Sequence, residues 1–188
     1  HGLKVQRAAE ANGVTPLEWA DRTSERFRDA WKLLDISNDD FIRTSEPRHH
    51  AAVQQILQRV NDNGYIELGT YEGLYCVSCE AYYTVDELIE GSLCPIHNRP
   101  VEHVKEDNYF FALSKFGDRL HRHLQEHPGF VQPDIRRNEV LKVIEGGLED
   151  ISVSRSGVEW GIPLPLDPKH VVYVWFDALI NYISALGW

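Results

Sequence analysis

The three cysteines of this chain lie close together and are followed by a histidine. They form the pattern C-x2-C, fourteen residues, C-x2-H, whose four members are Cys76, Cys79, Cys94 and His97. Two ligands separated by two residues can bind one ion from a tight turn, and zinc prefers thiolate and imidazole donors. Because four protein ligands complete a tetrahedron, the pattern predicts a closed, structural zinc site. Three cysteines cannot all pair in disulfides, which argues against an oxidised framework.

Length and charge narrow the class of protein. The 188 residues suffice for one large domain, or for one domain that carries a smaller insert. A net charge of −10 argues against a general nucleic-acid coat protein, because phosphate binding needs clustered Lys and Arg. No apolar run is long enough to cross a bilayer, and zinc-type cysteines suit a reducing cytosol, so we expect a cytoplasmic protein without a membrane partner. The chain contains no Met, and we expect it to be an internal piece of a longer polypeptide.

The start of the chain carries the signals of two helices. We expect one helix over His1–Asn12 that ends at Gly13, since glycine often terminates a helix. Thr15 and Glu18 stand three residues apart around Pro16, which is the pattern of a capping box that opens a second helix. The apolar residues of this second helix lie near helical spacing, which predicts one face packed on a core. These residues are Ala20, Phe27, Trp31 and Leu34.

A short strand and a third helix are expected next. Leu34–Thr44 is predicted to be the strand, and we interpret Asp39 and Asp40 as turn residues rather than as paired carboxylates. The third helix begins at Pro47. Its neighbouring histidines diverge by about 100°, so at most one of them faces any given site, and we predict no metal site there. The residues expected on one side are His50, Val53, Ile56, Leu57 and Val60.

The middle of the chain changes character. Tyr65–Val104 contains short β-type runs around the cysteines, and such a segment is too small to be stabilised by burial alone. Zinc would therefore substitute for the missing core in an inserted subdomain. Helices are expected over Asn108–Glu126 and Asn138–Glu145. The first of them carries basic residues, which we interpret as an exposed polar face rather than as an RNA contact, given the acidity of the chain.

The last forty residues have α/β character. Val171–Trp175 is a nearly continuous apolar run of the kind buried in a parallel sheet. Ligands bind at the carboxyl ends of such strands, so Trp175, Ala178 and Tyr182 are candidates for a binding pocket. Trp175 is alternatively a core residue. Asp177 is either the cap of the following helix or a ligand contact.

Several stretches of this chain resemble methionyl-tRNA synthetases, a family of class I aminoacyl-tRNA synthetases, and they occur in the order found in that family. They are DDFIRTSEPRHHAAVQQI, YEGLYCVSCEAYYT, LCPIHNRPVE, NYFFALSKF, SRSGVEWGIPLPLDP and VYVWFDALINYISALG. The resemblance implies an α/β fold in which a Rossmann-type parallel sheet is interrupted by a small zinc-binding insert domain. Residues 1–60 would end the first half of the Rossmann catalytic domain, residues 61–150 would form the insert, and residues 151–188 would start the second half.

The resemblance also implies a reaction and its site residues. ATP, with Mg²⁺, would activate methionine as methionyl-adenylate, and the methionyl group would pass to the 3′ end of a tRNA. Trp175, Ala178, Leu179 and Tyr182 would line the methionine pocket, where aromatic walls suit a polarizable thioether. Arg155 would be a catalytic residue that holds ATP or the developing charge. Zinc would be structural.

Two motifs of this family are missing from the chain, namely HxGH and KMSKS, which bind the ATP phosphates. Because adenylate formation needs preorganised positive groups around the phosphorus, the isolated chain is expected to be inactive. An alternative is a non-catalytic zinc-binding module that docks RNA or protein, although such a module needs no aromatic pocket. A metallohydrolase is disfavoured because protein fills all four zinc positions.

Overall fold

A computed structural model describes residues 1–187 of the chain, and Trp188 lies outside the described residues. Three helices come first, α1 (Leu3–Ala11), α2 (Pro16–Leu33) and α3 (Pro47–Asp62). The predicted capping box is confirmed, because the side chain of Thr15 accepts a hydrogen bond from the Glu18 amide at 3.2 Å and Glu18 accepts one from the Thr15 amide at 2.8 Å. The predicted start of α3 at Pro47 is also confirmed.

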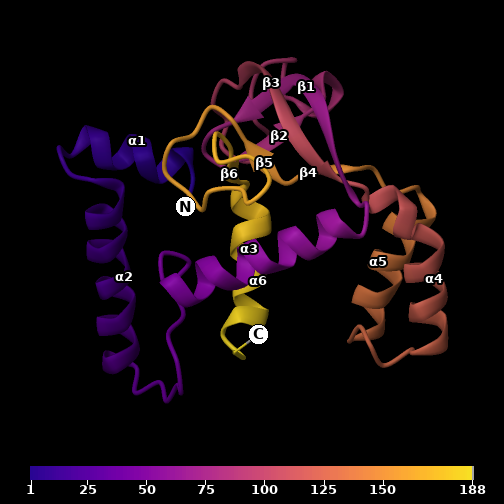
Figure 1. Cartoon of the computed structure of the whole chain (residues 1–188), viewed down its shortest axis with the longest axis horizontal. Helices are drawn as coiled ribbons and strands as arrows, with labels where there is room; N and C mark the ends of the chain where they lie inside the picture. The colour runs from indigo at the N-terminus through magenta and orange to yellow at the C-terminus, as the bar shows by residue number, and fades with distance from the viewer. Residues whose placement is uncertain (188) are drawn as a thin grey trace.

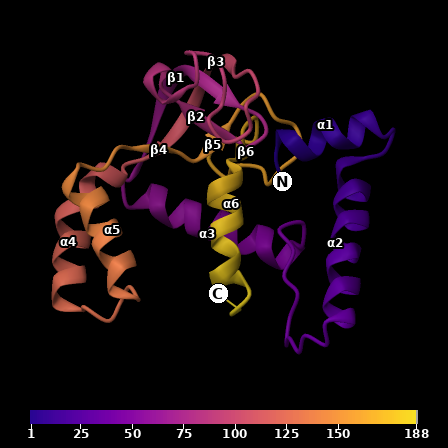
Figure 2. The same cartoon turned by 180° about the vertical axis from the view of Figure 1, so that it is seen from behind.

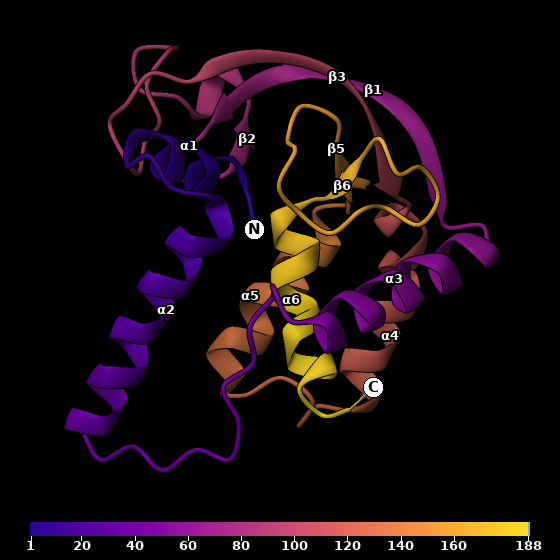
Figure 3. The ribbon, with the colours of Figure 1, turned by 60° about the vertical axis from the view of Figure 1, so that its left-hand side comes forward.

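Four strands form an antiparallel sheet in the order β2-β1-β3-β4. They are β1 (Ile66–Cys76), β2 (Ala81–Tyr83), β3 (Glu102–Phe111) and β4 (Ile151–Ser152). β1 and β3 pair along almost their whole length, and Figure 3 shows them as a curved ribbon that arches over the rest of the molecule. The prediction of a helix from Asn108 is therefore wrong, because Asn108–Phe111 pairs with Ile66–Gly69 in the sheet.

Helices α4 (Gly117–Glu126) and α5 (Asp134–Glu145) follow β3. They lie side by side as a hairpin at one side of the molecule, whereas α1 and α2 lie at the other side (Figures 1 and 2). Short 3-10 turns occupy Val85–Glu87 and Leu113–Phe116. The helix predicted over Asn138–Glu145 is confirmed, and it starts four residues earlier than expected.

The end of the chain differs from the predicted strand. β5 (Ser154–Arg155) pairs antiparallel with β6 (Val171–Val172), and helix α6 already begins at Val174 and runs to Ser184. The strand predicted over Val171–Trp175 is therefore wrong in length, and its pairing is antiparallel rather than parallel. Among residues 1–187, all pairings between strands are antiparallel.

The hydrophobic core lies where α3 meets α6 and the strands near the end of the chain. Side chains from these elements are almost inaccessible and pack together. They are Val53, Leu57, Val153, Ile162, Leu164, Val172 and Ile180. Figures 1 and 2 show α6 crossing α3 at the centre of the molecule, below the sheet. None of the helices that the structure describes has both the length and the apolar character needed to cross a bilayer.

Two further expectations are wrong. Helix α2 buries none of its residues, and Phe27 is 58% exposed, because α2 packs mainly on the short helix α1 rather than on the core. Leu34–Thr44 forms no strand, since it has no partner strand and instead bends at Asp39. Asp40 there accepts a hydrogen bond from the Phe41 amide at 2.8 Å, as expected of a turn residue.

Candidate functional site

The four predicted zinc ligands come together beside the β1–β2 hairpin. Their ligand atoms all lie within 4.8 Å of one another. The Sγ atoms of Cys79 and Cys94 are 3.6 Å apart, and Sγ of Cys94 lies 3.7 Å from Nδ1 of His97. Neighbouring ligands of a tetrahedral zinc ion stand about 3.5–3.8 Å apart when the Zn–S and Zn–N bonds have their usual lengths. The donor set and its geometry therefore fit zinc.

Local backbone geometry creates this arrangement. Cys76 ends β1, and Glu80, directly after Cys79, has a positive φ of 51°, which turns the chain back into β2. In the second turn the Cys94 amide donates to the Arg99 carbonyl at 2.9 Å, and the Asn98 amide donates to the Cys94 carbonyl at 2.8 Å. The C-x2-C and C-x2-H spacings thus become two tight turns that face each other.

The thiols of Cys79 and Cys94 differ in pKa. Burial raises the pKa of Cys79 to about 11, although a hydrogen bond with the Tyr83 hydroxyl, 3.2 Å away, opposes the rise. Burial would also raise the pKa of Cys94, but hydrogen bonds from His97 and from the Ile96 amide outweigh it and lower that pKa to about 6. A thiolate is thus favoured at Cys94, and a metal that binds all three sulfurs displaces a proton from Cys79.

A mostly apolar cavity of about 1000 Å³ lies between α6 and the sheet. Trp175 and Leu179 of α6 line it, whereas Ala178 and Tyr182 are not among its lining residues. All four residues recur at intervals of three and four along α6, so they share one side of the helix. Other walls come from Ile56, Tyr82, Phe110 and Ile151. Sequence reasoning missed these wall residues, because they come from α3 and from strands that only the fold brings to α6.

The indole of Trp175 is held by the zinc-binding segment, Cys76–His97. Its Nε1 donates a hydrogen bond to the Glu80 carbonyl at 2.9 Å, and the Tyr173 hydroxyl donates to the same oxygen. Glu80 directly follows Cys79, and its side chain accepts a hydrogen bond from the Lys4 amide at 2.9 Å. Burial raises the pKa of this carboxyl. One turn therefore joins a metal-ligand position, the start of α1 and a wall of the cavity.

Arg155 lies in β5 and is buried, with 5% of its surface exposed. Its Nε is 2.5 Å from Oε1 of Glu106 on β3, and its guanidinium lies 4.3 Å from the ring centre of Tyr75. Burial would raise the pKa of Glu106, but the charge of Arg155 and a hydrogen bond from Tyr82 outweigh it and lower that pKa. Arg155 does not line the large cavity.

Asp177 does not have the first of its predicted roles, that of the cap of α6. The cap of α6 is Tyr173, and Asp177 lies inside the first turns of the helix. Its side chain is inaccessible, does not line the cavity, and contacts two histidines instead, His1 and His49. The sequence offered no signal for this pairing, because the three residues are far apart in the chain.

Comparison with known proteins identifies the family. The family described as tRNA synthetases class I (M) matches residues 1–102 and 93–188. Methionine–tRNA ligases of Streptomyces coelicolor and Thermotoga maritima are 51% and 50% identical over the whole chain, which spans 36% and 30% of those relatives. The crystal structure of Mycobacterium tuberculosis methionyl-tRNA synthetase bound by methionyl-adenylate superposes with a TM-score of 0.93 at 41% identity. That match covers all of this chain and 38% of the solved one, and it confirms the class I synthetase fold with its mixed helices and strands, whereas the strand pairings among residues 1–187 are antiparallel. The chain spans about a third of its relatives and belongs to the class I tRNA synthetases of the (M) family.

Proposed function

We propose that the chain is part of a methionyl-tRNA synthetase, which activates methionine with ATP and Mg²⁺ and then transfers it to the 3′ end of a tRNA. The observation that carries this proposal is the fit of the entire chain, at a TM-score of 0.93, to a relative described as bound by methionyl-adenylate. The curated relatives, named methionine–tRNA ligases, support tRNA as the acceptor.

The methionine pocket of this enzyme is proposed to use one side of α6, with Trp175, Ala178, Leu179 and Tyr182. Trp175 and Leu179 border the cavity, and the hydrogen bond to the Glu80 carbonyl keeps the indole in one orientation. A thioether gains favourable contacts with aromatic rings, and a preorganised ring loses little freedom on binding. Tyr182 is 72% exposed here and is therefore accessible to a substrate. It would contact the methionine in the whole protein.

Arg155 is proposed to act on ATP or on the charge that develops at its phosphates. Its guanidinium pairs with Glu106 and lies over the Tyr75 ring in this structure. In contacting a phosphate, Arg155 would exchange this anionic partner for another. Such an exchange is chemically reasonable, because a guanidinium pairs with carboxylate and phosphate oxygens in the same forked geometry.

Zinc is proposed as a structural ion held by Cys76, Cys79, Cys94 and His97. The distances between the ligand atoms support it, and free cysteines are consistent with a cytoplasmic protein. We further propose that residues 61–150 form an insert between two parts of a Rossmann catalytic domain, residues 1–60 and 151–188. The zinc-binding segment would then brace the pocket through the Glu80 carbonyl.

Amino-acid-dependent ATP–pyrophosphate exchange in the full-length protein tests the proposal. Wild-type protein should exchange with methionine and far more weakly with leucine. Trp175→Ala should raise the KM for methionine about tenfold or more, since it removes a pocket wall worth a few kcal/mol. Trp31→Ala is the matched control, because Trp31 packs on Phe41 and neither residue lines the cavity. Exchange that does not respond to methionine would refute the proposed function, and an unchanged KM in Trp175→Ala would refute the pocket.

A further inference from the structure

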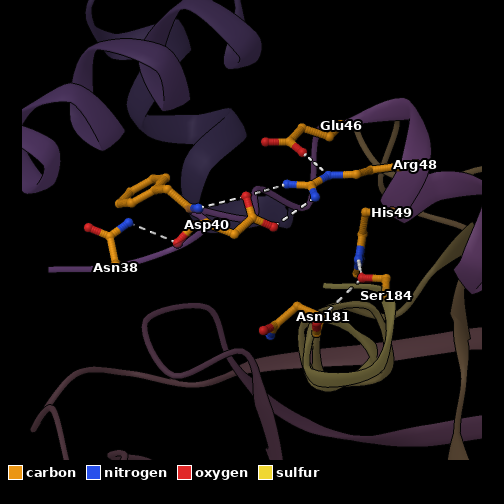
Figure 4. Close-up of polar contacts among 8 residues, drawn as sticks. Asn38, Asp40, Glu46, Arg48, His49, Asn181 and Ser184 are labelled. Carbon is orange, nitrogen blue, oxygen red and sulfur yellow. Dashed lines mark hydrogen bonds and ion pairs between the residues drawn. The ribbon is translucent and has the colours of Figure 1, made fainter. Parts of the chain in front are cut away.

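A buried polar link joins α3 to α6 in the middle of the apolar core. His49 of α3 has no exposed surface. Its Nε2 lies 2.7 Å from Oδ1 of Asp177, near the start of α6, and its Nδ1 lies 2.7 Å from Oγ of Ser184, at the end of the same helix. Figure 4 shows the imidazole of His49 pointing from α3 to Ser184 of α6. One side chain therefore holds α6 at two points.

The second oxygen of Asp177 is bonded as well. Nδ1 of His1 lies 2.5 Å from Oδ2, and the side chains of His1 and Asp177 are 4% and 1% exposed. An unpaired buried carboxylate is costly, so the two imidazoles stabilise Asp177 in its place. His1 also packs edge-on against Trp160, at 4.7 Å between ring centres. The link thus extends from α3 through α6 to the segment before α1.

The end of α3 that carries His49 is fixed from outside the core. Arg48, the preceding residue, contacts both carboxylate oxygens of Asp40 at 2.7 and 2.8 Å, and its Nε lies 2.5 Å from Glu46 (Figure 4). These pairs are partly exposed and individually weak. Together they connect the bend at Asp39 to the first turn of α3, which sets the direction from which His49 enters the core.

The two hydrogen bonds of His49 determine the rotation and the axial position of α6, which apolar packing alone does not. Asp177 and Ser184 are seven residues apart on the buried side of the helix, a distance of about 10 Å along its axis. Hydrophobic contacts have no preferred direction, whereas hydrogen bonds do. Two directional bonds at opposite ends therefore determine both the rotation of α6 and its position along its axis. Trp175, Leu179 and Tyr182 lie on the opposite, accessible side of the same helix.

We propose that His49 is a positioning residue for the methionine pocket, and that it acts by fixing the rotation of α6 through Asp177 and Ser184. This inference rests on the proposed function. Binding-site side chains must stay within about 0.5 Å and 10–20° of their productive positions, and a larger displacement weakens the binding of the substrate. Loss of His49 therefore changes the positions of Trp175 and Leu179, although His49 contacts neither of them.

The test uses the full-length protein with three variants. His49→Leu removes both bonds, and His49→Gln keeps an amide nitrogen near Nε2 that can donate to Asp177. Val53→Ala is the matched control, because Val53 is equally buried one turn along α3 and belongs to the same apolar core cluster as Ile180. In pyrophosphate exchange, His49→Leu should raise the KM for methionine about tenfold, with smaller changes in kcat and in the KM for ATP. His49→Gln should recover most of that loss, and Val53→Ala should lose stability but keep its KM.

Amide hydrogen exchange of α6 separates the inference from the function. The amide hydrogens of residues 174–184 should exchange faster in His49→Leu than in Val53→Ala. This difference is expected even if the protein activates no methionine. Equal protection of α6 in the two variants, or equal KM values for methionine, would overturn the inference. If His49→Leu does not fold, Ser184→Ala removes only the bond at the far end of α6, and a wild-type KM for methionine in Ser184→Ala overturns the inference too. Wild-type protein without methionine-dependent exchange refutes the proposed function alone.

Discussion

The buried ion pair between Glu106 and Arg155 gives a sharp prediction about stability. The two side chains are 7% and 6% exposed, and Nε of Arg155 lies 2.5 Å from Oε1 of Glu106. Glu106→Gln keeps the shape of the side chain but removes its charge, which leaves a buried guanidinium without a counter-ion. Breaking such a pair costs about 3–5 kcal/mol. The Tyr82 hydroxyl retains an oxygen acceptor in the amide, so its hydrogen bond, 2.9 Å long in the wild type, adds little to the loss.

The expected loss is measurable by thermal and urea unfolding of the zinc-loaded chain. About 4 kcal/mol corresponds to a decrease in Tm of about 8–16 °C for a chain of this size. Glu102→Gln is a matched control, because Glu102 lies on the same strand and pairs with Arg7 through side chains that are both 48% exposed. That exposed pair should contribute less than about 1 kcal/mol. If Glu106→Gln is no more destabilising than Glu102→Gln, the inference that Arg155 depends on a buried partner is wrong.

Further predictions concern acid, zinc, the isolated chain and the pocket. The pKa of Glu106 in the folded protein lies below its usual value of 4.5, so ionised Glu106 stabilises the fold above pH 4.5 and this stabilisation is lost as the pH falls through the folded pKa. The wild type should therefore lose more free energy of unfolding on acidification than Glu106→Gln does. Parallel curves of stability against pH would contradict this. Cys94→Ser should abolish stoichiometric zinc, measured by elemental analysis, whereas one zinc per chain would disprove the ligand set. The isolated 188-residue chain should show no pyrophosphate exchange, and turnover above background would disprove the need for the missing motifs. Trp175→Phe should abolish the fluorescence change on methionine addition to the full-length protein, and an unaltered change would argue against the pocket.

Local signals in the sequence determined several elements correctly. Thr15 and Glu18 predicted the start of α2, and Pro47 predicted the start of α3, because capping depends only on residues within one helical turn. The spacing of the cysteines and His97 predicted a cluster that the structure brings together. Ligands two residues apart form a tight turn whatever surrounds them, so that part of the geometry is encoded locally as well.

The tertiary structure decided everything that depends on a distant partner. Asn108–Phe111 has the apolar character of a helix or a strand, and it became a strand because Ile66–Gly69 pairs with it. The sequence placed His50 on the inner side of α3, yet His49 is the buried residue, since only the position of α6 determines which side of α3 is covered. Asp177 likewise is buried through its contacts with His49 and His1, which precede it in the chain by 128 and 176 positions. Helical periodicity specifies which side chains share a face, but only packing specifies what that face meets.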